Sequence, residues 1–217
     1  MSLVSFENIP IQECSELLVD LAGYDFMLEP VYFKTGSADT NKMYLRQGVA
    51  DKLLAIQKEF KIYKFKIWDG YRPRVVQNNI YEKYWQELKK LHPEWDKEKM
   101  QNEVGVFITN AQDTNRIPPH ATGGAVDLTL VDAEGKELNM GTEFDYFGPE
   151  AAVLYFEGNN INDEVRQNRK LLREAMEIMG FRIEPYEWWH YDYGNQLWAS
   201  TLHKPAAIYG ETFPEKC

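Results

Sequence analysis

Two short segments far apart in the chain each place a histidine close to a carboxylate. The first, residues 120–127, reads HATGGAVD, and the second, residues 187–190, reads EWWH. The chain has only four histidines, and two of them lie in these segments. A catalytic Zn²⁺ is typically held by three imidazole or carboxylate ligands, with one position left for water and a carboxylate nearby to take a proton. A fold that brings the segments together would therefore assemble the groups of a zinc site: His120, Asp127, Glu187 and His190.

The residues after the paired glycines predict a buried strand that carries Asp127. The glycines allow a sharp bend, and residues 125–130 then alternate with the period of a strand. We expect Asp127 to point from the face opposite to the one formed by Val126, Leu128 and Leu130.

The second segment needs a change of backbone direction to face the same site. Glu187 and His190 are three residues apart, and an ideal strand would point them to opposite sides. A turn or bulge therefore has to re-aim one of them, in which case the two tryptophans between them are expected to wall the site. Spacing alone leaves another interpretation open, in which the first histidine caps a loop, Asp127 is a carboxylate near a turn, and the tryptophans are core residues.

A third block stands at the end of another predicted strand. Residues 63–68 alternate as a strand, and Asp69-Gly70-Tyr71-Arg72 follow before Pro73 stops further pairing. This position puts Arg72 just past a strand end. Without that context, a single arginine is more typical of a solvated surface.

Taken in this order, the three blocks resemble the zinc D-Ala-D-Ala dipeptidases of the vancomycin-resistance (VanX) type. These belong to a wider group of metallopeptidases that includes zinc D-Ala-D-Ala carboxypeptidases. The similarity runs from about residue 20 to residue 203. It implies that Zn²⁺ is bound by three residues, His120, Asp127 and His190. It also implies that Glu187 is the general base and acid and that Arg72 steadies the oxyanion.

The resemblance also bears on the substrate. A segment similar to residues 140–145 contributes a carboxylate that holds the free ammonium of the substrate in that family, so Asp145 is the candidate here. Taken alone, Asp145 is equally well an ordinary loop residue. The family usually has serine two residues before the first zinc histidine, where this chain has Pro118. That serine helps to hold the substrate, so the replacement bears on which dipeptide is recognised.

Three functions are compatible with these residues. The resemblance implies hydrolysis of a D-Ala-D-Ala-type dipeptide by metal-activated water, with a glutamate as general base. A zinc carboxypeptidase or endopeptidase acting on larger peptidoglycan peptides would use the same groups in an open groove. A zinc-binding module without catalysis would keep the ligands but could lose the base, so the presence of Glu187 favours an enzyme.

Composition narrows the class of protein further. A length of 217 residues suits one domain, 1–217, and 44% hydrophobic residues are typical of a globular protein. The net charge of −10 argues against nucleic acid as a partner. The resemblance implies a small peptide as the substrate. Cys14 and Cys217 are expected to be free thiols. Neither a membrane span nor an export signal is apparent, so a cytoplasmic location is expected. The sequence leaves the oligomeric state open.

The remaining patterns predict a single α+β domain, in which an antiparallel or mixed sheet carries the zinc site and helices pack on the other face. Apolar periodicity predicts helices at residues 46–60, 75–91 and 163–179, and a short, heavily charged helix is expected at residues 96–104. A strand is expected at residues 17–23, and a last strand from residue 181 delivers Glu187 and His190. Residues 24–40 show no clean period and are interpreted as a loop on the substrate side.

Overall fold

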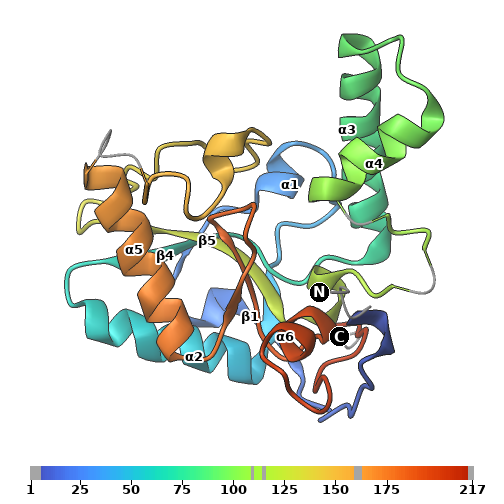
Figure 1. Ribbon diagram of the computed structural model, residues 1–217. Coiled ribbons are helices and arrows are strands. Elements are labelled where there is room, and N and C mark those ends of the chain that lie inside the picture. Colours follow the sequence, from blue (N-terminus) through green and yellow to red (C-terminus); the bar gives the residue numbers. More distant parts are fainter. Residues whose placement is uncertain (1–5, 109, 114–115, 159–162, 215–217) are drawn as a thin grey trace.

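The computed structural model describes residues 6–108, 110–113, 116–158 and 163–214, and its centre is a mixed sheet of five strands (Figure 1). In spatial order these strands are β2 (Met27–Leu28), β4 (Lys64–Asp69), β5 (Ala125–Val131), β7 (His190–Asp192) and β6 (Arg182–Ile183). The β2 and β4 strands are parallel, and the other neighbours are antiparallel. A separate two-stranded sheet pairs β1 (Leu18–Asp20) with β3 (Tyr44–Arg46). The mixed sheet agrees with the prediction.

The register of the sheet aligns three polar residues across three strands. A shift between Ile67 and Asp69 places Asp69 opposite Asp127, and Asp127 in turn lies opposite His190. Without that irregularity, the strict alternation of β4 would carry Asp69 out of step with Asp127. The bulge therefore brings the end of β4 into line with the candidate metal ligands.

Helices α2 (Gln47–Phe60) and α5 (Asp163–Ile178) lie on the side of the molecule away from α3 and α4 (Figure 1). Apolar side chains repeat along each helix at the spacing that makes one face buried. These faces share one core with β4 and β5, which includes Val49, Leu53, Phe65, Val126, Leu128, Leu130, Leu172 and Met176.

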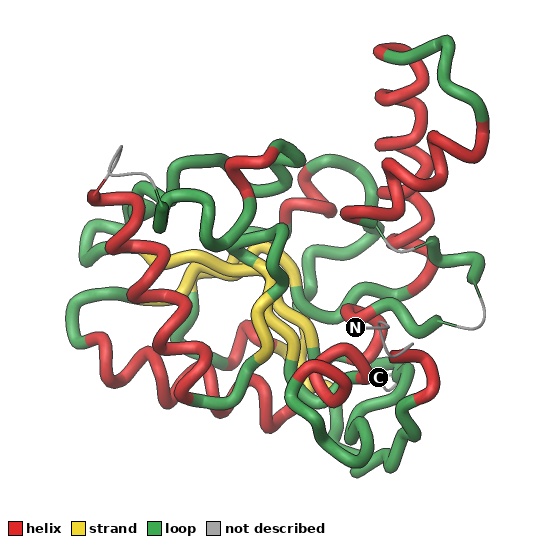
Figure 2. Tube along the Cα trace, in the orientation of Figure 1, coloured by secondary structure: helices red, strands yellow, loops and turns green. Residues whose placement is uncertain are grey.

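Helices α3 (Arg74–Leu91) and α4 (Lys97–Phe107) form a hairpin that extends beyond the rest of the molecule (Figures 1 and 2). A smaller apolar cluster joins the two helices, and Tyr32 of α1 (Val31–Lys34) belongs to it. The base of the hairpin therefore lies against the segment that precedes β3. No helix in the described part of the chain is both long enough and apolar enough to cross a membrane.

The short elements complete the chain. They are the α6 helix (Gln196–Thr201) and the 3-10 helices η1 (Phe6–Asn8), η2 (Leu21–Gly23), η3 (Pro119–Thr122) and η4 (Pro149–Ala151).

Three expectations about individual segments are wrong. The strand expected at residues 17–23 ends at Asp20, because the Asp20 side chain caps the 3-10 helix η2 that follows. Residues 24–40 are not one irregular loop, because they contain β2 and α1. Each of these elements is too short for periodicity to reveal it, since a helix pattern needs several turns. The last strand is not continuous either: a turn separates β6 from β7, and the two strands pair with each other. In addition, β5 is buried on both faces, so its Asp127 face is not open to solvent.

Candidate metal centre

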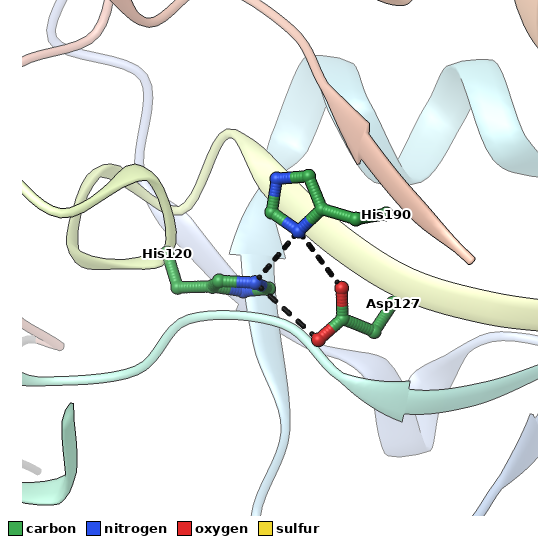
Figure 3. A group of neighbouring side chains, drawn as sticks. All are labelled: His120, Asp127 and His190. Atoms are coloured by element: carbon green, nitrogen blue, oxygen red, sulfur yellow. Dashed lines mark hydrogen bonds and ion pairs between the residues drawn. The ribbon is translucent and has the colours of Figure 1, made fainter. Parts of the chain in front are cut away.

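Three side chains converge at the junction of η3, β5 and β7 (Figure 3). His190 Nδ1 lies 2.9 Å from Asp127 Oδ1 and 3.2 Å from His120 Nε2. His120 Nε2 lies 3.4 Å from Asp127 Oδ2. All three residues are buried, and each offers one ligand atom within 4.8 Å of the others. The structure thus brings together the three residues that the sequence analysis named as ligands.

The paired glycines let the chain between His120 and Asp127 pass very close to neighbouring segments. Gly123 has φ +69°, and a Cβ there would lie 2.4 Å from Leu18 Cδ2. A Cβ on Gly124 would lie 2.2 Å from the carbonyl oxygen of Tyr193. Because real Cβ atoms do not approach so closely, only glycine fits at both positions without moving the neighbouring chain.

A turn brings Glu187 and His190 to the same side, although three residues of an ideal strand would point them to opposite sides. The backbone N–H of His190 donates to the carbonyl of Glu187 at 3.2 Å, and that of Glu187 donates to the carbonyl of Glu184 at 3.3 Å. This turning chain lets Glu187 line the same cavity as His190. The expectation that a turn or bulge re-aims one of the two residues is confirmed.

The two histidines present opposite ring nitrogens to the centre. His120 Nδ1 lies 2.7 Å from the carbonyl oxygen of Gly70, which can only accept, so this nitrogen carries the proton and Nε2 is free to act as a ligand. His190 instead directs Nδ1 inward, while its Nε2 lies 3.2 Å from Asp192 Oδ1. Two imidazoles and one carboxylate form a typical donor set for a catalytic Zn²⁺, so these residues fit that ion.

Arg72 is a buried cation beside this donor set. Its Nε donates to Asp69 Oδ2 at 2.7 Å and its Nη1 to Gln77 Oε1 at 2.9 Å. Its Nη2 lies 3.4 Å from Asp127 Oδ2. Burial alone would lower the pKa of Arg72, but Asp69, Tyr32 and Asp127 outweigh it and raise that pKa. Arg72 is therefore charged at any physiological pH, and it is not a solvated surface residue.

Asp145 lies across the cavity in a left-handed backbone conformation, with φ +59°. Burial raises the pKa of Asp145 to about 7, the nearby Asp127 adds to the rise, and Arg72 opposes it. The hydroxyl of Tyr32 donates to Asp145 at 3.1 Å, and the Tyr32 ring lies 4.5 Å from the Arg72 guanidinium. Sequence analysis missed Tyr32, because nothing in residues 24–40 marks one tyrosine as different from its neighbours.

Glu187 is the remaining carboxylate of the predicted set. Burial raises the pKa of Glu187 to about 8 in the metal-free protein. His190 opposes this rise, whereas the negative charges of Asp127, Glu184 and Asp145 support it. A carboxyl group in such surroundings can exchange a proton near neutral pH.

These residues line one small cavity of about 160 Å³. The α3–α4 hairpin closes part of it through Gln77, Ile80 and Gly105. Trp189 also lines the cavity, as expected. Trp188 does not, because its ring packs in the core and its Nε1 donates to Thr142 Oγ1 at 2.7 Å.

The chain belongs to the D-Ala-D-Ala dipeptidase family, because the model of that family matches residues 23–209. It is therefore placed among the peptidases, and the resemblance inferred from its three sequence blocks is confirmed. A D-alanyl-D-alanine dipeptidase of Synechocystis is 29% identical over 93% of this chain and 94% of the relative. A D-alanyl-D-alanine dipeptidase of Enterococcus faecium is 32% identical over 59% of this chain and 61% of the relative.

Two solved structures are also similar to this chain. One is VanYB in complex with D-alanine-D-alanine, with 16% identity, a TM-score of 0.47, and coverage of 84% of this chain and 87% of that one. The other is the D,D-pentapeptidase VanY in complex with Zn(II), with 16% identity, a TM-score of 0.48, and coverage of 93% and 96%.

Proposed function

We propose that this protein is a zinc-dependent dipeptidase that hydrolyses D-Ala-D-Ala or a closely related dipeptide. Three residues would hold the metal: His120, Asp127 and His190. The observation that carries the proposal is the small cavity in which this donor set meets a partly buried base, a buried cation and a second carboxylate. Family membership supports the same activity.

The chemistry needs a Lewis acid, a base and an oxyanion donor. When bound, Zn²⁺ polarises the substrate carbonyl and acidifies water beside it. Glu187 accepts the proton of the attacking water and then passes it to the leaving amine. Burial raises the pKa of Glu187 in the metal-free protein. A metal cation held close by would favour the ionised form of Glu187 and so offset this effect. Arg72 donates hydrogen bonds to the carbonyl oxygen as negative charge develops there.

Charges at the edge of the cavity match the two ends of a free dipeptide. Asp145, held by Tyr32, would pair with the substrate ammonium. The substrate carboxylate needs a donor, and proline at position 118 has no side-chain donor to offer. Arg116, two residues earlier, lines the cavity. We assign Arg116 as the residue that binds the carboxylate of the substrate.

Cavity size favours a dipeptide over a longer peptide. Its volume of about 160 Å³ is below the roughly 300–1,000 Å³ of pockets that take drug-sized ligands. Residues of α3 and α4 narrow a site that a carboxypeptidase or endopeptidase would need to leave open as a groove.

The test compares hydrolysis of three substrates by the zinc-loaded protein: D-Ala-D-Ala, its N-acetylated form, and a pentapeptide that ends in D-Ala-D-Ala. We expect kcat/KM to be on the order of 10²-fold or more higher for the free dipeptide, because blocking the amine leaves Asp145 without its partner. Asp145→Asn should remove most of this preference. Equal or faster cleavage of the pentapeptide would instead establish the carboxypeptidase or endopeptidase alternative.

A further inference from the structure

We propose that Asp192 is a positioning residue of the metal centre, which holds the His190 ring so that Nδ1 faces the ion. This inference rests on the proposed function and deepens it, because it concerns how tightly the chain binds its metal. Asp192 belongs neither to the donor set nor to the cavity lining, so it acts only through His190.

Contact between the two side chains follows from their places on β7. His190 and Asp192 are two residues apart on one strand, so both point to the same face. Asp192 Oδ1 lies 3.2 Å from His190 Nε2, on the side of the ring away from Asp127 and His120. The Asp192 side chain is completely buried. A carboxylate can only accept, so Asp192 keeps a proton on Nε2 and leaves Nδ1, which faces Asp127 Oδ1, as the ring nitrogen that a metal can take.

Two donors hold the carboxylate of Asp192 in this orientation. Arg182 Nη1 donates to Oδ2 at 2.6 Å, and Asn195 Nδ2 donates to Oδ1 at 2.6 Å. Both donors are themselves fixed. Arg182 Nη2 pairs with Glu184 at 2.8 Å, and Asn195 Oδ1 caps helix α6 by accepting from the N–H of Trp198 at 2.9 Å. The carboxylate therefore cannot turn away from His190 without breaking a buried hydrogen bond.

The two histidines differ in what supports them. His120 Nδ1 donates to the backbone carbonyl of Gly70 at 2.7 Å, with the carboxylate of Asp69 farther away at 3.3 Å, whereas His190 Nε2 donates to the carboxylate of Asp192. An ionised partner makes the stronger hydrogen bond and raises the basicity of a ligating imidazole more than a neutral carbonyl does. Asp192 should therefore contribute to metal affinity through ring orientation and ligand strength together.

The decisive variant is Asp192→Asn, which keeps the shape but offers only one acceptor oxygen to Arg182, Asn195 and His190. Its amide group can donate to Nε2, which would favour the tautomer that places the proton on Nδ1. We expect zinc affinity, measured by competition with a chromophoric chelator, to fall about 10- to 100-fold. The visible spectrum of the Co²⁺-substituted protein should change, because the cobalt ion reports the geometry of its ligands.

Two further variants separate positioning from general stability. Thr201→Val removes an acceptor of Arg182 Nε, 3.2 Å away, without touching Asp192 or His190, and should leave zinc affinity unchanged. Asn195→Ser keeps a residue suited to cap α6 but removes one donor to Asp192, so it should weaken zinc affinity by less than Asp192→Asn does. If Asp192→Asn does not fold, Asn195→Ser and Thr201→Val are compared. Weaker zinc binding by Asn195→Ser alone supports the role of Asp192, and equal zinc affinity of the two variants overturns it.

The outcomes also separate this inference from the proposed function. If the wild-type protein binds zinc and hydrolyses D-Ala-D-Ala while folded Asp192→Asn keeps zinc affinity within twofold, only the role of Asp192 is overturned. The role is also overturned if Asp192→Asn lowers the melting temperature of the metal-free protein but leaves chelator competition and the Co²⁺ spectrum unchanged. A wild-type protein that binds no zinc would overturn the metal centre and this inference together.

Discussion

At Glu187, burial and nearby carboxylates act on the pKa in the same direction. Burial raises this pKa to about 8 in the metal-free protein, and burial likewise raises that of Asp145 to about 7. In an unfolded chain these groups titrate near 4. Between the two limits the folded protein holds protons that the unfolded chain has lost. The contribution of these two groups to the stability of the metal-free protein is therefore fully present below about pH 4. This contribution is lost as the pH rises through 7 and 8.

A pH series of melting temperatures tests this linkage. For the metal-free protein we expect the melting temperature of the wild type to fall between pH 5 and pH 8.5 more steeply than that of Glu187→Gln, because glutamine carries no charge to bury. The measurement is differential scanning calorimetry in the presence of a chelator. Parallel curves for the two proteins would show that Glu187 does not hold its proton in the folded state.

The same substitution separates metal binding from chemistry. Glu187→Gln keeps the size of the side chain but cannot accept a proton from water, so zinc content should remain stoichiometric while kcat falls by roughly 10²- to 10⁴-fold. Zinc is measured by atomic emission and turnover by release of free D-alanine. Loss of zinc together with activity would make Glu187 a ligand or a structural carboxylate, and substantial remaining activity would exclude it as the base.

Arg72 offers a second test at the same scale. Arg72→Lys keeps a positive charge near Asp127 but loses the geometry that joins the guanidinium to Asp69 and Gln77. We expect kcat to fall by roughly 10²- to 10³-fold, the scale seen when an oxyanion donor is removed, with zinc still bound. Near-normal turnover in this variant would contradict the assigned role.

Among the elements, helix α5 supports the substrate end of the site through one buried cation. Arg169 donates to the backbone carbonyls of Met140, Glu150 and Ala152, which lie on either side of Asp145 in the chain. Burial lowers the pKa of Arg169 to about 10, so the side chain is still charged at neutral pH. Helix α5 thereby holds the loop that presents Asp145 to the cavity.

Arg169→Met should loosen that loop while filling the space of the side chain. Carbonyl groups left without a donor cost about 1–3 kcal/mol each when they stay buried, so we expect the free energy of unfolding to drop by at least about 2 kcal/mol. KM for the free dipeptide should rise more than kcat falls, because Asp145 serves binding. Arg166→Met is the matched control on the same helix, since Arg166 pairs with the exposed Asp163. Equal effects of the two variants on KM would contradict the role of Arg169.

For the molecule as a whole, Arg46 joins segments from both ends of the chain to the loop that carries His120. Its buried side chain donates to the carbonyls of Glu16, Thr122 and Gly210 and pairs with Glu13. These partners come from residues 13–16, from the loop that carries His120 and from residue 210. The site therefore depends on chain segments that no local sequence pattern connects.

Arg46→Met should consequently destabilise the entire fold. Removing a buried cation leaves several acceptors unpaired, and we expect a loss of about 3–5 kcal/mol in urea denaturation. Lys64→Met is the control, because the Lys64–Asp25 pair is exposed and should contribute no more than about 1 kcal/mol. Similar losses of unfolding free energy in the two variants would show that Arg46 contributes no more to stability than an exposed ion pair does.

Much of this architecture was predictable because it depends on local periodicity. The long helices repeat apolar residues at the spacing that buries one face, and the strand that carries Asp127 alternates apolar residues with the period of a strand, although the tertiary structure buries both of its faces. The residue types of the candidate centre were predictable for a chemical reason, which is local to short segments of the sequence. Imidazole and carboxylate groups beside bend-forming glycines suit few other chemistries, and three such blocks in order resemble one family.

Sequence by itself thus determined the secondary-structure elements with several turns or alternations and the set of groups available for a metal. Only the tertiary structure decided how those groups are supported and enclosed. Tyr32 reaches Asp145 from a helix of four residues, Asp192 supports His190, and the base of the α3–α4 hairpin narrows the cavity. Such contacts depend on sheet register and on packing between distant segments, and these long-range interactions leave no periodic trace in the sequence.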